Sequence, residues 1–158
     1  MKKEKATILV FSGELDKILS AFTVAIGAAS SGMDVTMFFT FWGLNVLKKK
    51  KLIRGKGIKQ KIMNMMNNST ADSLPLSKFN MLGAGPLMMK SIMKDSRFPQ
   101  VKELMKTAKE LKVRFIACTT SIAMMGLSKD DFIPVDDYAG VATYLNIAKN
   151  SKLNLFIS

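Results

Sequence analysis

Apolar and polar residues alternate over the first forty positions in a pattern that predicts a strand, a helix and a second strand. The run "ATILVFS", Ala6 to Ser12, is apolar and β-branched, which is typical of a buried strand. Helical spacing follows and stops at Gly32, with apolar positions at Leu15, Ile18, Leu19, Phe22, Ile26 and Ala29. "DVTMFFTF", Asp34 to Phe41, predicts a second buried strand. A strand, helix, strand unit favours a parallel sheet.

The last sixty residues continue this alternation. Pro99 begins a predicted helix, and "VRFIAC", Val113 to Cys118, follows as a third strand. The remaining predicted elements are a short helix over Ser121 to Leu127, a brief strand over Phe132 to Pro134, a helix capped by Asp136 or Asp137, and a closing strand over Leu153 to Ser158. We therefore predict one doubly wound α/β domain over residues 1–158, Rossmann-like, with a mostly parallel sheet of about five strands.

A segment of different composition, at about residues 47–95, interrupts this domain. Between Gly43 and Lys94 there are eleven Lys or Arg and one acid, Asp72, so this segment carries +10 of the chain's net charge of +12. It also holds seven of the thirteen methionines. We predict a helical, basic, Met-rich insertion whose first part, Lys48 to Asn68, is mobile or lies at a subunit or partner surface.

Residue counts limit the chemistry. The chain has 158 residues, a single cysteine, Cys118, and no histidine. These counts exclude an intramolecular disulfide, the common zinc sites, and the Ser-His and Cys-His nucleophile pairs within one chain. We expect no cofactor and no metal, and whatever activates Cys118 must be backbone, hydroxyl or cationic.

The chain shows no pattern typical of export or of a membrane span. The N-terminus, "MKKEKATILVFSGE", has neither a long apolar region nor a small-residue cleavage site. The longest apolar stretch, Val35 to Leu47, is 13 residues long, which is shorter than the roughly 18 to 20 that a spanning helix needs. A cytoplasmic protein is therefore expected.

Several polar residues fall where predicted parallel strands end. Because the carboxyl ends of parallel strands share one edge of a sheet, we expect one crevice lined by Ser12, Gly13, Thr40, Trp42 and Cys118. Cys118 also precedes a predicted helix, whose free N–H groups favour a thiolate or a persulfide anion. The hydroxyl residues that follow it, Thr119, Thr120 and Ser121, can cap that helix or donate hydrogen bonds to the sulfur.

Three stretches together resemble the DsrE/DsrF-like sulfur-relay family. They are "FFTFWGL" after the second strand, "MLGAGPLMMKSIM" in the insertion, and "FIACTTSIAMMGL" around the cysteine. The resemblance covers nearly the whole chain and is to the branch with a Met- and Gly-containing insertion. It maps the sulfur-bearing residue of the family onto Cys118.

The resemblance implies a three-layer flavodoxin-like domain that forms trimers or hexamers. It implies a persulfide carrier or sulfurtransferase, with sulfane sulfur held on Cys118 and exchanged with rhodanese-like and TusA-like proteins. A peroxiredoxin activity, with which such sequences are sometimes labelled, is disfavoured because "KVRFIA" before Cys118 lacks the expected proline and hydroxyl residues.

Other interpretations concern the insertion. The chain could be a noncatalytic binding or assembly domain that docks an acidic partner or an anionic membrane surface through this segment. "KKKK", Lys48 to Lys51, is equally typical of a solvated stretch. Nucleic-acid binding is disfavoured because the lysine run has no interleaved aromatic residues. "GAG", Gly83 to Gly85, lacks the strand and the third glycine of a nucleotide-binding loop.

Overall fold

The structure, a computed structural model, describes residues 3–51, 55 and 57–158. Within these residues the chain forms one five-stranded sheet in the order β4-β3-β2-β1-β5, and all neighbouring strands are parallel. The strands are β1 (Lys5–Val10), β2 (Asp34–Phe39), β3 (Arg114–Cys118), β4 (Asp137–Ala139) and β5 (Leu153–Ile157). The predicted α/β class and parallel sheet are confirmed.

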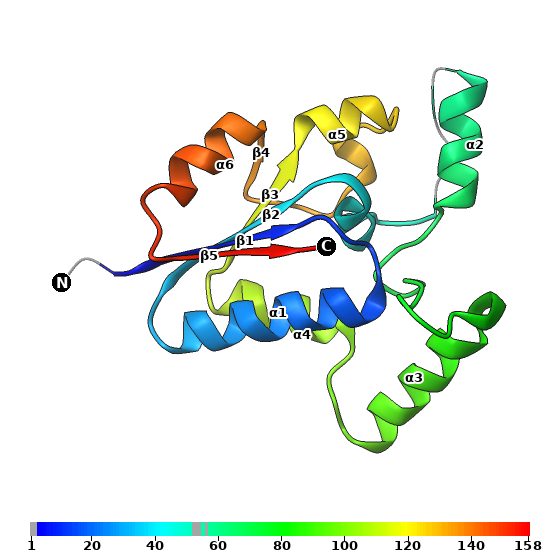
Figure 1. Ribbon diagram of the computed structural model, residues 1–158, viewed down its shortest axis with the longest axis horizontal. Helices are drawn as coiled ribbons and strands as arrows, with labels where there is room; N and C mark the ends of the chain where they lie inside the picture. Colours follow the sequence, from blue (N-terminus) through cyan, green and yellow to red (C-terminus); the bar gives the residue numbers. More distant parts are fainter. Residues whose placement is uncertain (1–2, 52–54, 56) are drawn as a thin grey trace.

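Helices cover both faces of the sheet (Figure 1). On one face α1 (Leu15–Ser30) packs beside α4 (Val101–Glu110), and on the other lie α5 (Thr119–Met124) and α6 (Val141–Ala148). Beneath α1, the buried ring of Phe22 has its centroid 6.2 Å from that of Phe39 and 5.7 Å from that of Phe115. The helical spacing read from the sequence thus places Phe22 in the core, and the expected three layers are present.

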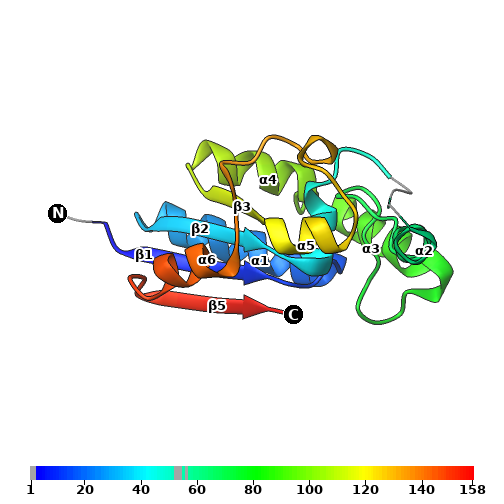
Figure 2. The same cartoon turned by 90° about the horizontal axis from the view of Figure 1, so that it is seen from above.

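The connections after β2 and β3 leave the sheet toward opposite faces (Figures 1 and 2). After β2 the chain returns through α4, on the same face as α1, whereas after β3 it enters α5 on the other face. In open parallel sheets such a reversal creates a crevice beyond the carboxyl ends of the two strands. Here these ends carry Thr40 and Cys118.

The connection between β2 and α4 is the predicted insertion, and it is largely helical. It contains η1 (Phe41–Leu47), α2 (Ile58–Met66), η2 (Met81–Gly83) and α3 (Ala84–Asp95). Helices α2 and α3 extend as two separate arms beyond the carboxyl edge of the sheet (Figure 1). Arg54 and Lys56, two of the basic residues counted in this segment, lie outside the described residues.

Polar contacts over long sequence separations hold the α2 arm in place. The Asn64 side chain is buried and donates a hydrogen bond to the Met125 carbonyl at 2.8 Å. At the end of the arm, Asn45 Nδ2 donates to Asn67 Oδ1 at 3.0 Å. These bonds attach α2 to the end of α5 and to η1. The mobility of residues 48–68 stays a prediction.

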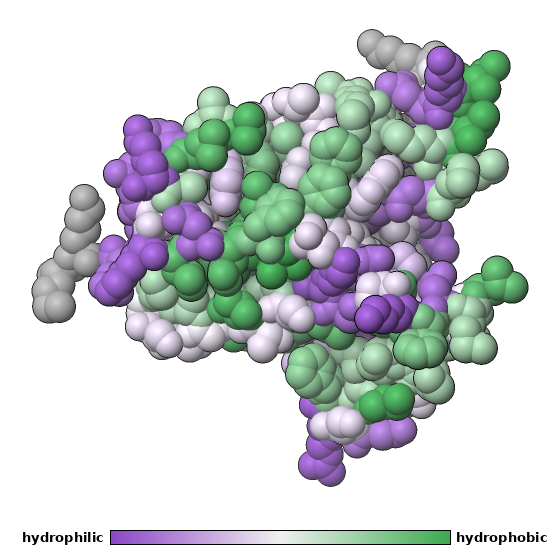
Figure 3. Space-filling view, in the orientation of Figure 1, coloured by the Kyte–Doolittle hydropathy of each residue, from purple (hydrophilic) through white to green (hydrophobic). Residues whose placement is uncertain are grey.

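Both arms expose apolar side chains, visible as green regions in Figure 3. The exposed residues of the two arms are Ile58, Ile62, Met65, Met66, Leu87, Met88 and Ile92, with Phe79, Met81 and Leu82 just before α3. Lysines Lys59, Lys61, Lys90 and Lys94 lie on the same two helices, so the arms are both basic and apolar. Among the described residues, no helix is both long and apolar enough to cross a membrane.

Two predictions about the last third of the chain are wrong. Phe132 forms only an isolated bridge with Lys48, and the fourth strand begins at Asp137 rather than within Phe132 to Pro134. Neither aspartate caps the next helix, because its N-cap is Gly140. Asp136 instead accepts a hydrogen bond from the Phe115 N–H at 2.8 Å, which ties it to β3.

Candidate functional site around Cys118

Cys118 occupies the junction between β3 and α5, where it is both the last residue of the strand and the N-cap of the helix. The helix therefore begins at Thr119, two residues before the predicted start. Cys118 belongs to a small cluster of buried residues that includes Phe38, Ile116 and Tyr144, and it is only 5% exposed. The residue two positions later, Thr120, is exposed.

Hydrogen-bond donors from two chain segments converge on the sulfur. Burial raises the pKa of the Cys118 thiol, but hydrogen bonds from the Ser121 N–H and hydroxyl, the Thr40 hydroxyl and the Thr120 N–H together lower this pKa below its ordinary value of 9.0. The Thr40 and Ser121 hydroxyl oxygens are 2.8 Å apart and share a hydrogen bond, in which one hydroxyl donates its single proton to the other and leaves the second hydroxyl free to donate to the sulfur. The thiolate is the nucleophilic form of cysteine, and a lowered pKa increases its fraction near neutral pH.

Thr40→Val is expected to raise the pKa of Cys118, because valine keeps the shape of threonine but cannot donate a hydrogen bond to the thiolate. At pH values below the pKa, less thiolate should form and alkylation by iodoacetamide should slow. The pH profile of the alkylation rate measures this change. Thr23→Val, on the exposed surface of α1, is the control and should leave the profile unchanged. An unchanged profile in Thr40→Val as well would show that the Thr40 hydroxyl does not act on the sulfur.

The structure brings only some of the predicted site residues to Cys118. Thr40, Thr120 and Ser121 surround the sulfur, with Thr120 contributing its backbone N–H. Thr119 follows the cysteine directly, yet it makes no hydrogen bond to the sulfur within the described part of the chain. Two side-chain hydroxyls therefore lie at the sulfur, that of Thr40 after β2 and that of Ser121 in α5.

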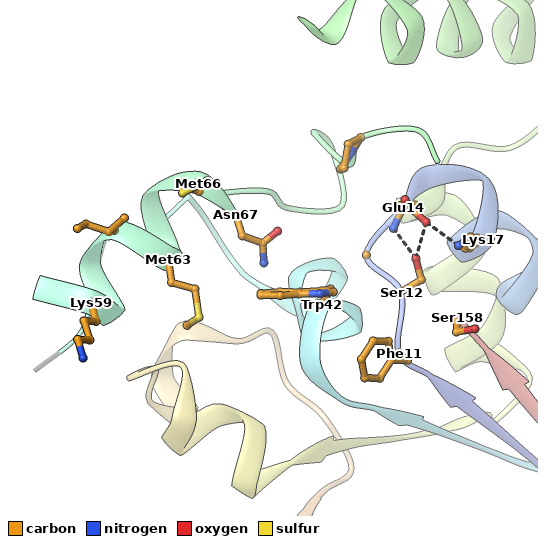
Figure 4. A pocket seen from close by; sticks show the side chains of 13 residues that line it. Phe11, Ser12, Glu14, Lys17, Trp42, Lys59, Met63, Met66, Asn67 and Ser158 are labelled. Carbon is orange, nitrogen blue, oxygen red and sulfur yellow. Dashed lines mark hydrogen bonds and ion pairs between the residues drawn. The ribbon is translucent and has the colours of Figure 1, made fainter. Parts of the chain in front are cut away.

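Ser12, Gly13 and Trp42 gather around a different feature, a pocket of about 830 Å³ that we call the Trp42 pocket (Figure 4). It lies beyond the carboxyl ends of β1 and β2, and Cys118 is not among its lining residues. Gly13 is required there because a Cβ at this position would lie 2.5 Å from the Trp42 carbonyl oxygen. The single crevice predicted from the sequence thus contains two distinct groups of residues.

Sequence reasoning missed the contribution of α2 to this edge of the sheet. Lys59, Met63 and Asn67 line the Trp42 pocket, whereas the sequence predicts for this part of the insertion only mobility or a subunit or partner surface. The spacing of these residues along the chain does not predict a binding site. They reach the pocket only because tertiary contacts hold the α2 arm in place.

The burial of Lys48 is another feature that the sequence did not predict. Lys49, Lys50 and Lys51 are exposed, but Lys48 is only 3% exposed, so the solvated interpretation of this run is wrong for its first residue. The Lys48 amine has no hydrogen-bond partner within the described residues. Burial lowers the pKa of Lys48 from 10.5 to about 8, although the charge of Asp131 partly opposes this effect.

Sequence comparisons connect this chain with proteins of one family. Residues 2–156 match the DsrE/DsrF/DrsH-like family. The chain is 41% identical to the uncharacterized protein YrkE of Bacillus subtilis, covering 98% of this chain and 97% of that one. It is 33% identical to the sulfur carrier protein DsrE2 of Allochromatium vinosum, covering 99% of this chain and all of the relative.

Solved structures share the fold at low sequence identity. A protein of unknown function, MTH1491 from Methanobacterium thermoautotrophicum, superposes with a TM-score of 0.53 at 9% identity and covers 98% of this chain and 99% of its own. The ychN protein of E. coli also gives a TM-score of 0.53, at 12% identity, with 96% and 98% covered. At these identities the similarity concerns the fold alone.

Proposed function

Because the chain belongs to the DsrE/DsrF/DrsH-like family, we propose that it acts in sulfur relay and holds sulfane sulfur as a persulfide on Cys118. The observation that carries this proposal is the thiol at the end of β3, whose pKa is lowered by hydrogen bonds from Ser121, Thr40 and Thr120. The similarity to a protein named as a sulfur carrier supports a relay role over the full chain length.

The proposed loading step is an exchange between a thiolate and a persulfide. The Cys118 thiolate attacks the outer sulfur of a donor persulfide, a new S–S bond forms at Cys118, and the S–S bond of the donor breaks. The electron pair of that bond leaves with the donor, which is released as a thiolate. Unloading is the same reaction in reverse, with the thiolate of an acceptor attacking the outer sulfur. No net oxidation or reduction occurs, so the step requires no cofactor.

The residues around Cys118 would stabilise the thiolate or persulfide anion by hydrogen bonds and would not act as proton donors or acceptors in the transfer. The donors that stabilise the Cys118 thiolate also stabilise a persulfide anion, since both carry negative charge on sulfur at the start of α5. The absence of histidine is then no obstacle. A chain with one cysteine also has no second thiol of its own that would discharge the persulfide as a disulfide.

Access to the sulfur sets a requirement on the partners. Because Cys118 is only 5% exposed, the residues over the sulfur have to shift before a second protein's thiol can reach it. We propose rhodanese-like donors and TusA-like acceptors as the proteins that induce this shift. The basic arms would attract an acidic partner toward this edge of the sheet.

Self-association into a trimer or hexamer stays a prediction. The like charges of the basic arms oppose contact between two copies through these arms. Outside the arms, Val141 and Leu145 on α6 and Phe156 on β5 are apolar side chains that are each more than half exposed.

The intact mass of the protein after incubation with a persulfidated donor tests the proposal. The wild-type chain should gain the mass of one sulfur atom, and a reductant should remove it. A protein that stays unmodified with several different persulfide donors would contradict the proposed function.

A further inference from the structure

We propose that Gln60 and Asn64 of α2 are positioning residues of the sulfur site, which hold the end of α5 and thereby keep Ser121 against the Cys118 sulfur. The donors to the sulfur lie after β2 and in α5, so the two α2 residues would act on it only through α5. This inference deepens the proposed function, and it rests on that proposal for its effect on sulfur transfer.

Helix α5 is short and depends on contacts at its ends. It has six residues, and isolated helices of this length are not stable in water. The Met125 N–H donates to the Ser121 carbonyl at 3.0 Å, and Gly126 ends the helix with a φ of +66°. The carbonyls of Met124 and Met125 come after the last turn, so α5 itself has no further N–H group for them.

Two side chains of α2 supply donors for these two carbonyls. Gln60 Nε2 donates to the Met124 carbonyl at 3.0 Å, and Asn64 Nδ2 donates to the Met125 carbonyl at 2.8 Å. Gln60 and Asn64 are four residues apart, so they lie on the same face of α2. The α2 arm therefore caps the carboxyl end of α5.

The two helices approach each other closely at this cap. A Cβ at Gly126 would lie 2.7 Å from Gln60 Oε1, so a larger residue would force the side chain of Gln60 to move. Asn64 and Met125 are both buried, so water does not readily replace the amide if the bond between them is lost. The Asn64 bond is therefore the stronger constraint on α5.

A continuous series of hydrogen bonds leads from α2 to the sulfur. Asn64 donates to the Met125 carbonyl, and the Met125 N–H donates to the Ser121 carbonyl. The Ser121 N–H in turn donates to the Cys118 sulfur, and the Ser121 hydroxyl shares a hydrogen bond with that of Thr40. Loss of the Asn64 bond would let the end of α5 move and would displace Ser121, so the thiolate would lose part of its stabilisation.

The pH profile of Cys118 alkylation by iodoacetamide tests this inference in the full chain. Asn64→Leu keeps the size of the side chain and removes the donor. The rate at pH 7, divided by the plateau rate at high pH, should fall about threefold, as expected when a hydrogen bond to the thiolate is weakened. This ratio reports the fraction of thiolate, whereas a change in access alone would alter both rates by the same factor.

Gln60→Leu is a second variant that affects the same cap. It should lower the ratio in the same direction but by a smaller factor, because Met124 is exposed and water can replace the lost donor. Asn67→Leu is the matched control. It removes the bond between α2 and Asn45 of η1 but leaves both bonds to α5 in place, so it should keep the wild-type ratio.

An unchanged ratio in a folded Asn64→Leu protein, or an equal fall in Asn67→Leu, would overturn the inference. If Asn64→Leu did not fold, an unchanged ratio in Gln60→Leu would overturn it instead.

Persulfide loading separates this inference from the proposed function. Asn64→Leu keeps Cys118, so it should still gain the mass of one sulfur atom, more slowly at pH 7. A wild-type protein that takes up no sulfur would contradict the relay and leave the alkylation profiles as they are. An Asn64→Leu protein with the wild-type profile would contradict only the positioning role.

Discussion

Cys118→Ser is expected to abolish the uptake of sulfur from a persulfide donor while leaving the fold intact. Serine is close to cysteine in shape, and its hydroxyl can keep hydrogen bonds with Ser121 and Thr40. Its oxygen stays protonated at neutral pH and cannot form the S–S bond that holds the cargo. Intact mass after incubation with the donor should therefore show no gain at all, compared with one sulfur atom for the wild type.

Ser121→Ala is the matched variant for this experiment. It removes a hydroxyl donor but keeps the thiol, so it should still accept one sulfur atom, more slowly near neutral pH because less thiolate is present. Circular dichroism should show that both variants are folded. If Cys118→Ser gained as much mass as the wild type, the sulfur would be bound elsewhere and the site assignment would be wrong.

Lys48→Met is expected to stabilise the protein by up to about 3 kcal/mol at pH 7. In the folded state burial lowers the pKa of Lys48 to about 8, whereas the ordinary value is 10.5, and this difference corresponds to roughly 3 kcal/mol. At pH values below 8 the folded state holds a buried charged amine that has no hydrogen-bond partner among the described residues. Methionine has a similar length and carries no charge, so it removes this cost.

The sign of the pH dependence follows from the lowered pKa. Between about pH 8 and 10.5 the folded protein has already lost the Lys48 proton that the unfolded chain still binds, so the stability of the wild type rises with pH. The advantage of Lys48→Met should therefore shrink over this range. The pKa of about 8 already includes the attraction of Asp131, and the Ser128 N–H still donates to that carboxylate at 2.8 Å after the substitution.

Urea unfolding at pH 7 and at pH 10 measures both parts of this prediction. Lys50→Met, which replaces an exposed lysine of the same run, should change the free energy of unfolding by no more than about 0.5 kcal/mol at either pH. A Lys48→Met protein that is less stable than the wild type at pH 7, or whose gain is equal at both pH values, would contradict the prediction.

The parts of the fold that could be predicted from sequence are those whose pattern is set locally. The runs that became β1, β2 and β3 are apolar because both faces of a central parallel strand are covered. β4 could not be recognised in this way, since Asp137–Ala139 is a short edge strand with little apolar character. Its location depends on pairing with β3, a long-range contact that no local pattern encodes.

The same distinction applies to the candidate site. Thr40 and Cys118 could be placed together because the ends of parallel strands share an edge. Lys48 is buried next to Phe132 and Asp131, which lie more than eighty residues away in the chain, so its burial could not be predicted from local sequence. The Trp42 pocket likewise depends on Asn64, which attaches α2 to the end of α5.

Transfer of radiolabelled sulfur through the protein tests the central claim most directly. The chain would be loaded from a labelled persulfide donor, separated from that donor, and mixed with a TusA-like acceptor. We predict that the label moves to the acceptor cysteine in the amount that leaves Cys118, and that prior alkylation of Cys118 prevents all loading. Label that stays on the protein in the presence of the acceptor, or that enters the alkylated protein, would contradict the account.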